Sequence, residues 1–541
     1  MTAQLLQDYV TRQAERRPEQ RALVLGDRPV TYGELETRAN RLAWLLKEAG
    51  CEPGDRVGLM LPKSPAAVAG MLATLKPGCI YVPVDPESPA ARVARILRAA
   101  DCRWLLASAP ALRLLEDLMP ELGAGTEVLW MGDEPPPDSA AFTPRFTESD
   151  AASFSAEPPP RALGRNDVPA HILFTSGSTG VPKGVMVTHA NVIAFVTWAN
   201  RYFGLGPADR VSCHSPLHFD LSTYDLYGGF AAGSEVHLVP PELNLFPSRL
   251  VDFLRNHRLT QWFSVPSVLS YLTRFDAVAP GDFPHLQRIL WCGEVFPTPA
   301  LKYWMERLPH VTFTNLYGPT ETTIASSYYT VPTPPVDPNA KVPIGEACGG
   351  EELLVLAADL KPLPPGTVGE IYIQGAGVTT GYWRDPEKTD LVFLPAVGGS
   401  GRVYRTGDLG YRDADGLIHF LGRADSQIKS RGHRIELGEI EAALHAIEAV
   451  GQGAVVAIEA PEFGGHVICC AYVPRRGAEA PPATVKRSLA ALVPRYMVPA
   501  HWRRMHALPT NANGKVDRVA LAASFRAEVA SNAQQHAASY S

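Results

Sequence analysis

The sequence predicts an α/β protein with a large N-terminal domain and a small α+β domain at its C-terminus. Predicted strands and helices alternate through residues 56–107 and again through 171–292, which is typical of parallel sheets with helical crossovers. From residue 352, short strands separated by Gly, Pro and Asp indicate a small β-rich subdomain. A further helix and two strands follow Asp425, and the total of 541 residues exceeds what one core usually supports.

The first α/β region begins with a scaffold helix. The segment Thr31-Tyr-Gly-Glu34 has the spacing of a capping box, and an apolar stripe at helical spacing follows it. Residues 133–163 hold two Pro-Pro-Pro runs and are predicted to be a surface loop. The other elements of this region are expected as strands at 56–61, 79–84 and 103–107 and as helices at 64–76 and 89–100.

The second α/β region is predicted to restart at a strand over 171–175. Its remaining strands are expected at 235–239, 261–265 and 288–292, and its helices at 185–200, 248–257 and 266–275. The alternative for the first of these helices is a start delayed by Thr188-His-Ala-Asn191. The strands of the β-rich subdomain are expected at 352–356, 369–374 and 416–421.

The C-terminal part is expected to form its own domain. Leu437, Ile440, Leu444 and Ile447 share one face of a helix, and strands at 453–458 and 466–473 and a helix at 483–493 follow. The predicted organisation is a core at 1–422, a hinge at 423–425, a mobile domain at 426–525 and a disordered tail at 526–541.

Composition excludes several classes of protein. The chain is 46% apolar and 20% charged with a net charge of −6, so it lacks the basic excess of nucleic-acid-binding proteins and shows no polybasic membrane patch. It has no signal-peptide core and no uninterrupted run of about 18 apolar residues. We expect a cytoplasmic protein that binds neither nucleic acid nor membrane. Its eight cysteines lack zinc-site spacing and are expected to be reduced and mostly buried.

A loop rich in glycine and hydroxyl groups follows the strand at 171–175. Glycines allow close backbone approach, and the hydroxyls and one lysine offer donors and a cation to an anionic group. The spacing is not that of a P-loop, because Pro182 stands sixth from Gly177. The alternative is an ordinary turn between a strand and a helix. The candidate residues are Thr175, Ser176, Gly177, Ser178, Thr179, Gly180 and Lys183.

Three later segments carry polar groups in turns. Asn315–Glu321 joins an aromatic side chain, a Gly-Pro turn and a carboxylate, Tyr404–Asp408 ends a strand on a Gly-Asp pair, and Asn511–Lys515 presents a lysine on a polar loop. Each alone is compatible with a plain turn. Only the occurrence of all these segments together, in this order along the chain, indicates a particular function.

Together these segments resemble the adenylate-forming superfamily, most closely the amino-acid adenylation enzymes of nonribosomal peptide synthesis. The resemblance covers about residues 5–520. Cys79 stands where glycine is common, and His218 where a small or aromatic residue is more usual, which puts selectivity in doubt rather than the reaction. Besides the segments above, the resembling motifs are Leu75–Pro86, Phe219–Tyr224, Gly369–Trp383, Tyr404–Leu409 and Gly422–Glu441.

The resemblance implies attack of a substrate carboxylate on the α-phosphate of MgATP, followed by thioester formation on a phosphopantetheine thiol. The glycine-rich loop and Lys183 would hold the β,γ-phosphates, Glu321 would bind Mg²⁺, and Lys515 would bridge the carboxylate and the α-phosphate. The remaining implied roles are Tyr317 against adenine, Asp408 on the ribose hydroxyls, Arg423 supporting the ribose, Thr320 beside the catalytic carboxylate, Gly293, Glu294, Asn315 and Gly318 around the nucleotide, and Asp425 as the hinge.

Asp220 decides the expected substrate class. In the resembling enzymes this position pairs with the substrate α-ammonium, and a buried carboxylate without a cation is costly; the alternative is a cap of the following helix. The apolar pocket predicts a small neutral amino acid, with alanine favoured and proline, cysteine or valine close behind. The residues expected to line it are Leu221, Tyr224, Phe263, Leu290, Cys292, Leu316, Ile324 and Ala325.

The acceptor of the activated group is expected to be a separate carrier protein. Only 26 residues follow Lys515, and they contain no serine-bearing motif of a carrier domain. The alternatives are an acyl- or aryl-CoA ligase that consumes free CoA and a binding module without catalysis. Retention of Lys183, Glu321, Asp408 and Lys515 argues against the second alternative.

Overall fold

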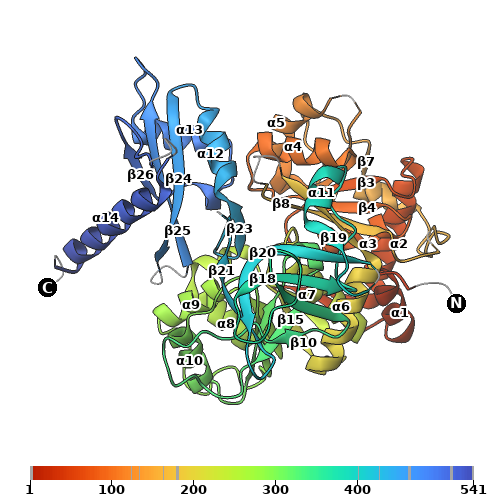
Figure 1. Cartoon of the computed structure of the whole chain (residues 1–541). Coiled ribbons are helices and arrows are strands. Elements are labelled where there is room, and N and C mark those ends of the chain that lie inside the picture. The colour runs from red at the N-terminus through yellow and green to blue at the C-terminus, as the bar shows by residue number, and fades with distance from the viewer. Residues whose placement is uncertain are drawn as a thin grey trace. The chain divides into compact units, whose positions relative to one another are not determined.

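The computed structural model describes most of the chain and divides it into two compact units (Figure 1). The boundary between the long segments lies between Ala424 and Asp425, inside the segment predicted as a hinge. The described residues are 4–123, 125–132, 134–162, 164–177, 182–399, 401–425, 427–460, 465–511 and 516–538. The first unit is Met1–Pro86, Val93–Thr175 and Lys183–Ala424, and the second is Glu87–Arg92, Ser176–Pro182 and Asp425–Ser541.

A seven-stranded sheet forms one layer of the first unit. Its strands run in the order β7-β6-β5-β3-β4-β8-β9, and the pairs are parallel except for β8 with β9. The predicted βα alternation is therefore confirmed. The strands are β3 (Arg56–Met60), β4 (Ile80–Pro83), β5 (Cys102–Ala107), β6 (Glu127–Trp130), β7 (Phe146–Thr147), β8 (Pro169–Thr175) and β9 (Lys183–Thr188).

The segment after the glycine-rich loop differs from the prediction. A helix was expected from residue 185, with a start delayed by Thr188-His-Ala-Asn191 as the alternative. Residues 183–188 form β9, which was not predicted, and helix α6 (His189–Phe203) begins after Thr188, so the delayed start is confirmed. The β-branched run Val185-Met-Val-Thr188 favours a strand, and the Thr188 side chain caps the helix by accepting from the Asn191 N–H. The loop therefore joins two antiparallel strands rather than a strand and a helix.

A nine-stranded sheet forms the second layer, in the order β16-β15-β14-β13-β12-β10-β11-β1-β2. Its centre is parallel, and an N-terminal hairpin that the sequence did not reveal extends one edge by pairing β1 with β11. The strands are β1 (Arg21–Leu25), β2 (Arg28–Thr31), β10 (Arg210–Cys213), β11 (Glu235–Leu238), β12 (Gln261–Ser264), β13 (Arg288–Trp291), β14 (Thr312–Tyr317), β15 (Ser327–Thr330) and β16 (Glu346–Ala347).

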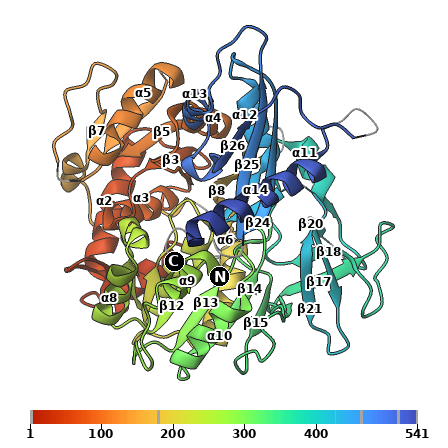
Figure 2. The same cartoon turned by 90° about the vertical axis from the view of Figure 1, so that its left-hand side faces the viewer.

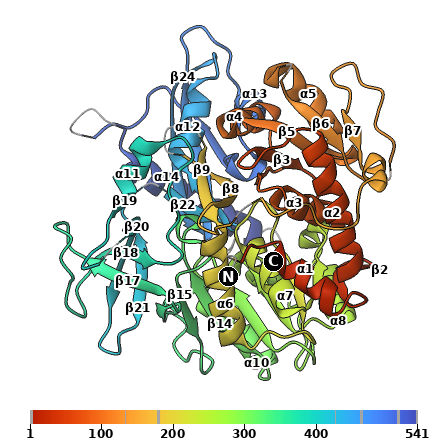
Figure 3. The same ribbon diagram turned by 90° about the vertical axis from the view of Figure 1, so that its right-hand side faces the viewer.

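The helices of the first unit pack around these sheets (Figure 3). The predicted capping box at Thr31 and Glu34 is present at the start of α2. The helices are α1 (Asp8–Arg16), α2 (Tyr32–Glu48), α3 (Pro65–Leu75), α4 (Ala90–Ala100), α5 (Leu112–Leu122), α6, α7 (Leu221–Ala232), α8 (Pro247–His257), α9 (Pro266–Arg274), α10 (Thr298–Arg307) and α11 (Pro386–Val392), with short 3₁₀ turns η1 (Ala109–Ala111), η2 (Glu148–Ser153), η3 (Pro241–Leu245) and η4 (Thr320–Thr322).

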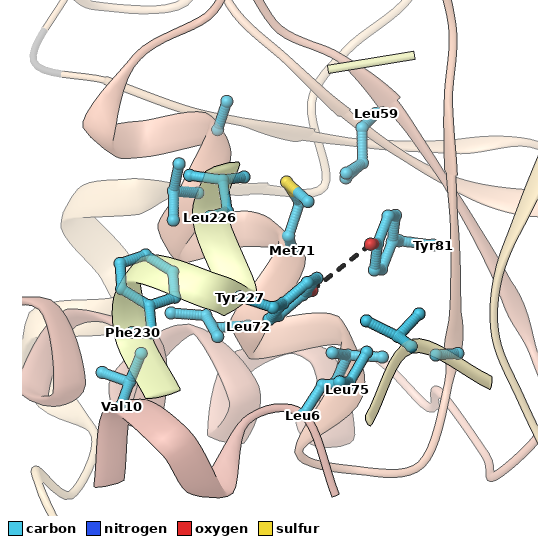
Figure 4. Close-up of a cluster of buried hydrophobic side chains, with 14 of the residues drawn as sticks. Leu6, Val10, Leu59, Met71, Leu72, Leu75, Tyr81, Leu226, Tyr227 and Phe230 are labelled. Atoms are coloured by element: carbon cyan, nitrogen blue, oxygen red, sulfur yellow. Dashed lines mark hydrogen bonds between the residues drawn. The ribbon is translucent and has the colours of Figure 1, made fainter. Parts of the chain in front are cut away.

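Helices α3 and α7 share one buried core (Figure 4). Met71 and Leu72 of α3 lie beside Tyr227 and Phe230 of α7, and the Tyr227 hydroxyl donates to the Tyr81 hydroxyl of β4 at 3.3 Å. Because α3 follows a strand of the seven-stranded sheet and α7 precedes one of the nine-stranded sheet, this core connects the two layers.

The predicted β-rich subdomain is a five-stranded antiparallel sheet (Figure 2). Its order is β17-β18-β20-β19, with β21 paired to β20. A small apolar core lies under it and includes Ile371 and Ile373 of β18. The strands are β17 (Glu351–Leu356), β18 (Gly369–Gly375), β19 (Phe393–Pro395), β20 (Arg402–Arg412) and β21 (Ile418–Arg423).

The C-terminal part of the second unit has the predicted α+β character. Its elements are β22 (Gln427–Ser430), β23 (His433–Glu436), α12 (Leu437–His445), β24 (Val450–Ala460), β25 (Gly465–Pro474), α13 (Pro482–Ala490), η6 (Arg495–Met497), β26 (His501–Arg504) and α14 (Arg518–Ala538). The prediction of a disordered tail from residue 526 is wrong for 526–538, which continue α14; the alanine-rich sequence there has high helix propensity.

Two expectations drawn from composition can be compared with the structure. All eight cysteines are buried and none forms a disulfide, as predicted for reduced core thiols. Among the residues that the structure describes, no helix is both long enough and apolar enough to cross a membrane.

Candidate active site

Asp220 stands at the first turn of α7 and is held by Thr320. It occupies the N-cap position, but its backbone is helical with φ −63° and its side chain makes no capping hydrogen bond. Instead, the Thr320 hydroxyl donates to Asp220 Oδ2 at 2.6 Å. The capping alternative is therefore not what the structure contains. The contact brings together two residues separated by 100 positions that the sequence assigned to the substrate and to catalysis.

Glu321 lies next to Thr320 and is fully buried. The Tyr382 hydroxyl donates to Glu321 Oε1 at 2.7 Å, and the Lys183 ammonium lies 5.2 Å from the centre of the Tyr382 ring. Such a cation over an aromatic face is attractive by roughly 0.5–2 kcal/mol. Tyr382 therefore connects the two residues predicted to bind Mg²⁺ and phosphate.

Tyr382 was not assigned a role from the sequence, although it lies in the quoted segment Gly369–Trp383. Its position is set by β9, because the Met186 N–H donates to the Gly381 carbonyl at 3.0 Å and the Trp383 N–H donates to the Gly184 carbonyl at 2.7 Å. An aromatic residue that follows a glycine is common in protein cores. The sequence around Tyr382 therefore did not indicate its contacts with Glu321 and Lys183.

Tyr317, Asp408 and Arg423 form one buried hydrogen-bonded group. The Tyr317 hydroxyl donates to Asp408 Oδ2 at 2.5 Å, and Arg423 donates to Asp408 Oδ1 at 2.7 Å. Burial, and secondly the Asp408 charge, raise the pKa of Tyr317 well above its usual range, so the phenol stays protonated as a donor. A carboxylate offers about four acceptor positions, so Asp408 keeps acceptor capacity for a diol.

The other predicted nucleotide residues lie in or just after neighbouring strands: Asn315 is in β14, Gly318 follows it, and Gly293 and Glu294 follow β13. The Asn315 amide donates to the Pro343 carbonyl at 2.8 Å, and Glu294 Oε2 accepts from the Ser267 N–H at 3.1 Å. Gly293 has φ +94°, which favours glycine. At Gly318 a β-carbon would lie 2.6 Å from Ala325 Cα, so close backbone packing requires glycine there.

The eight predicted pocket residues are brought together. All belong to one cluster of buried side chains, and each exposes at most 5% of its surface. The rings of Tyr224 and Phe263 meet edge to face with centres 6.1 Å apart, and the Cys292 thiol lies 3.9 Å from the Ile324 carbonyl. They come from α7, β12, β13, the residue after β13, β14 and the segment after η4. No carboxylate or ammonium group is among them.

Several predicted site residues lie in the second unit or outside the described residues. Thr175 ends β8 in the first unit, whereas Ser176, Gly177 and Asp425 group with the second. Ser178, Thr179, Gly180 and Lys515 lie outside the described residues. Their roles stay predictions.

Two protein-family models match the sequence of this chain. A model described as AMP-binding enzyme matches residues 10–383, and one described as AMP-binding enzyme C-terminal domain matches residues 439–515. The chain belongs to the AMP-binding enzyme family. Members of this family use ATP.

Proteins with similar sequences indicate which kind of AMP-binding enzyme this chain is. An L-proline–[L-prolyl-carrier protein] ligase of Pseudomonas fluorescens is 35% identical over 96% of this chain and 99% of its own length, and one of Streptomyces coelicolor is 35% identical over 92% of each. Tyrocidine synthase 3 of Brevibacillus parabrevis is 36% identical over 96% of this chain, which spans only 8% of that synthase. This AMP-binding enzyme is therefore an amino-acid adenylating ligase.

Solved structures agree with the fold. The amide bond synthetase McbA from Marinactinospora thermotolerans matches 96% of this chain and 100% of its own with a TM-score of 0.84 and 26% identity. The Vibrio cholerae adenylation domain AlmE, solved with glycyl-adenosine-5'-phosphate, matches 96% of this chain and 98% of its own with a TM-score of 0.82 and 25% identity. The predicted two-part α/β architecture is thus confirmed for this AMP-binding enzyme.

Asp408→Asn is expected to weaken ATP binding without affecting the amino acid. The amide keeps the shape but removes the charge that pairs with Arg423, and hydrogen bonds to charged groups contribute about 1.5–3 kcal/mol. The KM for ATP should rise roughly tenfold or more, measured by pyrophosphate exchange. Asp413→Asn, which removes a carboxylate paired with His419 on the same sheet, is the control and should leave both KM values unchanged. An unchanged KM for ATP in Asp408→Asn would contradict a ribose site at this residue.

Proposed function

We propose that this AMP-binding enzyme activates a small neutral amino acid, with proline as the leading candidate, and transfers it to the phosphopantetheine thiol of a separate carrier protein. The observation that carries the proposal is the Asp220 carboxylate, which the Thr320 hydroxyl fixes, together with the burial of the eight predicted pocket residues in one apolar cluster. The fixed anion suits an α-ammonium group, and the apolar pocket rejects charged side chains through their desolvation cost.

Proline replaces alanine as the first substrate to test. Both are neutral, and both keep a cationic amine for Asp220, so the pocket chemistry alone does not separate them. Two relatives that match nearly the whole chain are named as L-prolyl ligases. The rings of Tyr224 and Phe263 offer apolar contact to a pyrrolidine ring, and such pockets separate neighbouring side chains by about 1–3 kcal/mol.

The proposed reaction has two steps. A carboxylate oxygen of the amino acid attacks the α-phosphorus of ATP, the bond from that phosphorus to the bridging oxygen breaks, and pyrophosphate leaves with its electrons. The carrier thiolate then attacks the acyl carbon, a thioester forms, and AMP leaves. Asp220 orients the amine in the first step, Asp408 and Tyr317 orient the nucleoside, and Lys183 stabilises charge on the leaving phosphates.

The residues around Glu321 fit Mg²⁺. Magnesium is usually bound by one or two carboxylates together with substrate phosphates, rather than by a full protein cage. Glu321 supplies a buried carboxylate whose Oε1 already accepts from Tyr382, and no group of three or more potential metal-ligating side chains occurs among the described residues. When bound, the ion would neutralise phosphate charge. Glu321 would hold it with Tyr382 fixing the orientation of the carboxylate.

Pyrophosphate exchange across a panel of acids tests the proposal. The panel includes the twenty proteinogenic amino acids, a short fatty acid and an aryl acid. Proline should give the largest kcat/KM, with alanine, cysteine and valine lower and charged amino acids inactive. Exchange only with the fatty or aryl acid, and consumption of free CoA, would replace the proposal by the CoA ligase alternative.

A further inference from the structure

A strained turn carries two of the residues predicted to line the amino-acid pocket, Ile324 and Ala325. Thr323 has φ 60° and ψ 93°, and Ile324 has φ 70°. The Ala325 N–H donates to the Thr323 carbonyl at 2.8 Å, so Ile324 is the central residue of a three-residue turn. Positive φ is unusual for β-branched side chains and is energetically unfavourable. Two such residues in succession need support from outside the turn.

The first support is the Thr323 side chain. Its hydroxyl donates to the Gly377 carbonyl at 2.7 Å, and the residue is 2% exposed, so this bond is shielded from water. On the other side of the turn, the Ser326 N–H donates to the Tyr317 carbonyl at 2.7 Å. The turn is therefore fixed between β14 and the segment around Gly377.

Glu351 supports the segment around Gly377 in turn. The Gly377 N–H donates to Glu351 Oε1 at 2.5 Å, while Glu351 Oε2 is buried and makes no hydrogen bond among the described residues. The Asn191 amide of α6 donates to the Ala376 carbonyl at 2.7 Å. The backbone of Gly377 thus makes both contacts: its carbonyl accepts from Thr323 of the turn, and its N–H donates to the Glu351 carboxylate of β17.

We propose that Thr323 and Glu351 are positioning residues for amino-acid activation, which act through Gly377 to hold Ile324 and Ala325 in the left-handed turn that shapes the pocket. The inference rests on the proposed function, because it assumes that the acid substrate lies against Ile324 and Ala325. Neither residue touches substrate or nucleotide in this account. Their effect should therefore fall on the KM for the acid substrate rather than on the KM for ATP.

The burial of Glu351 should make the stability of the protein depend on pH. Burial raises the pKa of Glu351 to about 8, and the Gly377 N–H lowers it by a smaller amount. The titratable side chain that interacts with it is Cys348, whose own pKa is raised by burial and then by Glu351. Since the pKa in the folded state exceeds the ordinary value of 4.5, the unfolded chain loses its proton first. Stability contributed by this group is fully present below about pH 4.5 and is lost as the pH rises through about 8.

Thr323→Val and Thr323→Ser separate the positioning role from a packing role. Valine keeps the branched shape and removes the hydroxyl, whereas serine keeps the hydroxyl. Loss of a hydrogen bond worth about 1 kcal/mol predicts a roughly fivefold rise in the KM for the amino acid in Thr323→Val, with the KM for ATP unchanged and Thr323→Ser close to wild type. Thr197→Val removes a similar bond to the Ile193 carbonyl on α6 and is the matched control.

Glu351→Gln supplies the second measurement. The amide keeps an acceptor for the Gly377 N–H and cannot ionise, so its melting temperature should exceed that of wild type increasingly from pH 6 to pH 9. Over the same range, the KM for the amino acid should rise less in Glu351→Gln than in wild type.

The outcomes distinguish this inference from the proposed function. Equal increases in both KM values in Thr323→Val, no rescue by serine, or a pH-independent effect of Glu351→Gln would overturn the positioning role. If the panel identifies an acid other than an amino acid, the proposed function fails, but the same variants still test positioning through the KM for that acid.

Discussion

Asp220→Ala is expected to remove nearly all amino-acid-dependent pyrophosphate exchange. The substitution deletes the anion that would pair with the substrate ammonium and leaves the Thr320 hydroxyl without its acceptor at 2.6 Å. Removing one partner of a desolvated charge pair costs about 2–5 kcal/mol, which corresponds to a loss of roughly 30-fold to several thousand-fold in kcat/KM. The KM for ATP should change little, because Asp408 and Tyr317 are unaffected.

Asp220→Asn separates charge from shape in this experiment. Asparagine still offers an oxygen to Thr320 but no charge to the ammonium, so its activity should lie close to that of Asp220→Ala. Asp252→Ala, on an exposed carboxylate of α8 paired with Arg255, controls for the loss of a surface charge. Wild-type exchange by Asp220→Asn would show that the carboxylate does not select an amine.

Lys515→Ala is expected to abolish adenylate formation and to spare thioester formation from a supplied aminoacyl adenylate. The resemblance assigns Lys515 to the charge that develops between the carboxylate and the α-phosphate, and loss of one such donor typically costs 100- to 1,000-fold in kcat. Transfer to the carrier thiol does not involve that charge. The two half-reactions are measured by pyrophosphate exchange and by loading of a phosphopantetheinylated carrier protein.

The comparison of the two half-reactions tests whether the C-terminal domain alternates between them. The described chain divides at Ala424 and Asp425, next to the Arg423 that pairs with Asp408. Rotation at this point would exchange the groups presented to the substrate. Equal loss of both half-reactions in Lys515→Ala would contradict alternation. Lys486→Ala, at an exposed lysine of α13 in the same domain, is the control for general damage.

The layered fold could be predicted because its signals are local. Alternating strands and helices, the capping box at Thr31 and the change of pattern at residue 352 each depend on neighbouring residues. The segment 183–188 was misread because a glycine-rich loop usually precedes a helix, whereas β-branched residues and pairing with β8 favour a strand. The tail was misread because alanine and glutamine support either a helix or disorder.

The candidate site was predictable as a set of residues but not as a set of contacts. The resemblance assigned Asp220, Thr320 and Glu321, yet the bond between the first two depends on how α7 and η4 meet. The roles of Tyr382 and Glu351 depend on segments that approach Lys183 and Thr323 only in the folded chain. Positive φ at two β-branched residues runs against local preference, so no local pattern could have indicated that turn.

The shared core of α3 and α7 has a consequence for how the large unit unfolds. One buried cluster, which includes Met71, Tyr81 and Tyr227, reaches both sheets. Unfolding of either sheet would therefore also disrupt the packing of the other. The two layers should therefore melt as one cooperative transition rather than in sequence. A truncated chain that keeps only one of the two sheets should therefore not fold, so the nucleotide residues and the amino-acid residues cannot be studied on separate fragments.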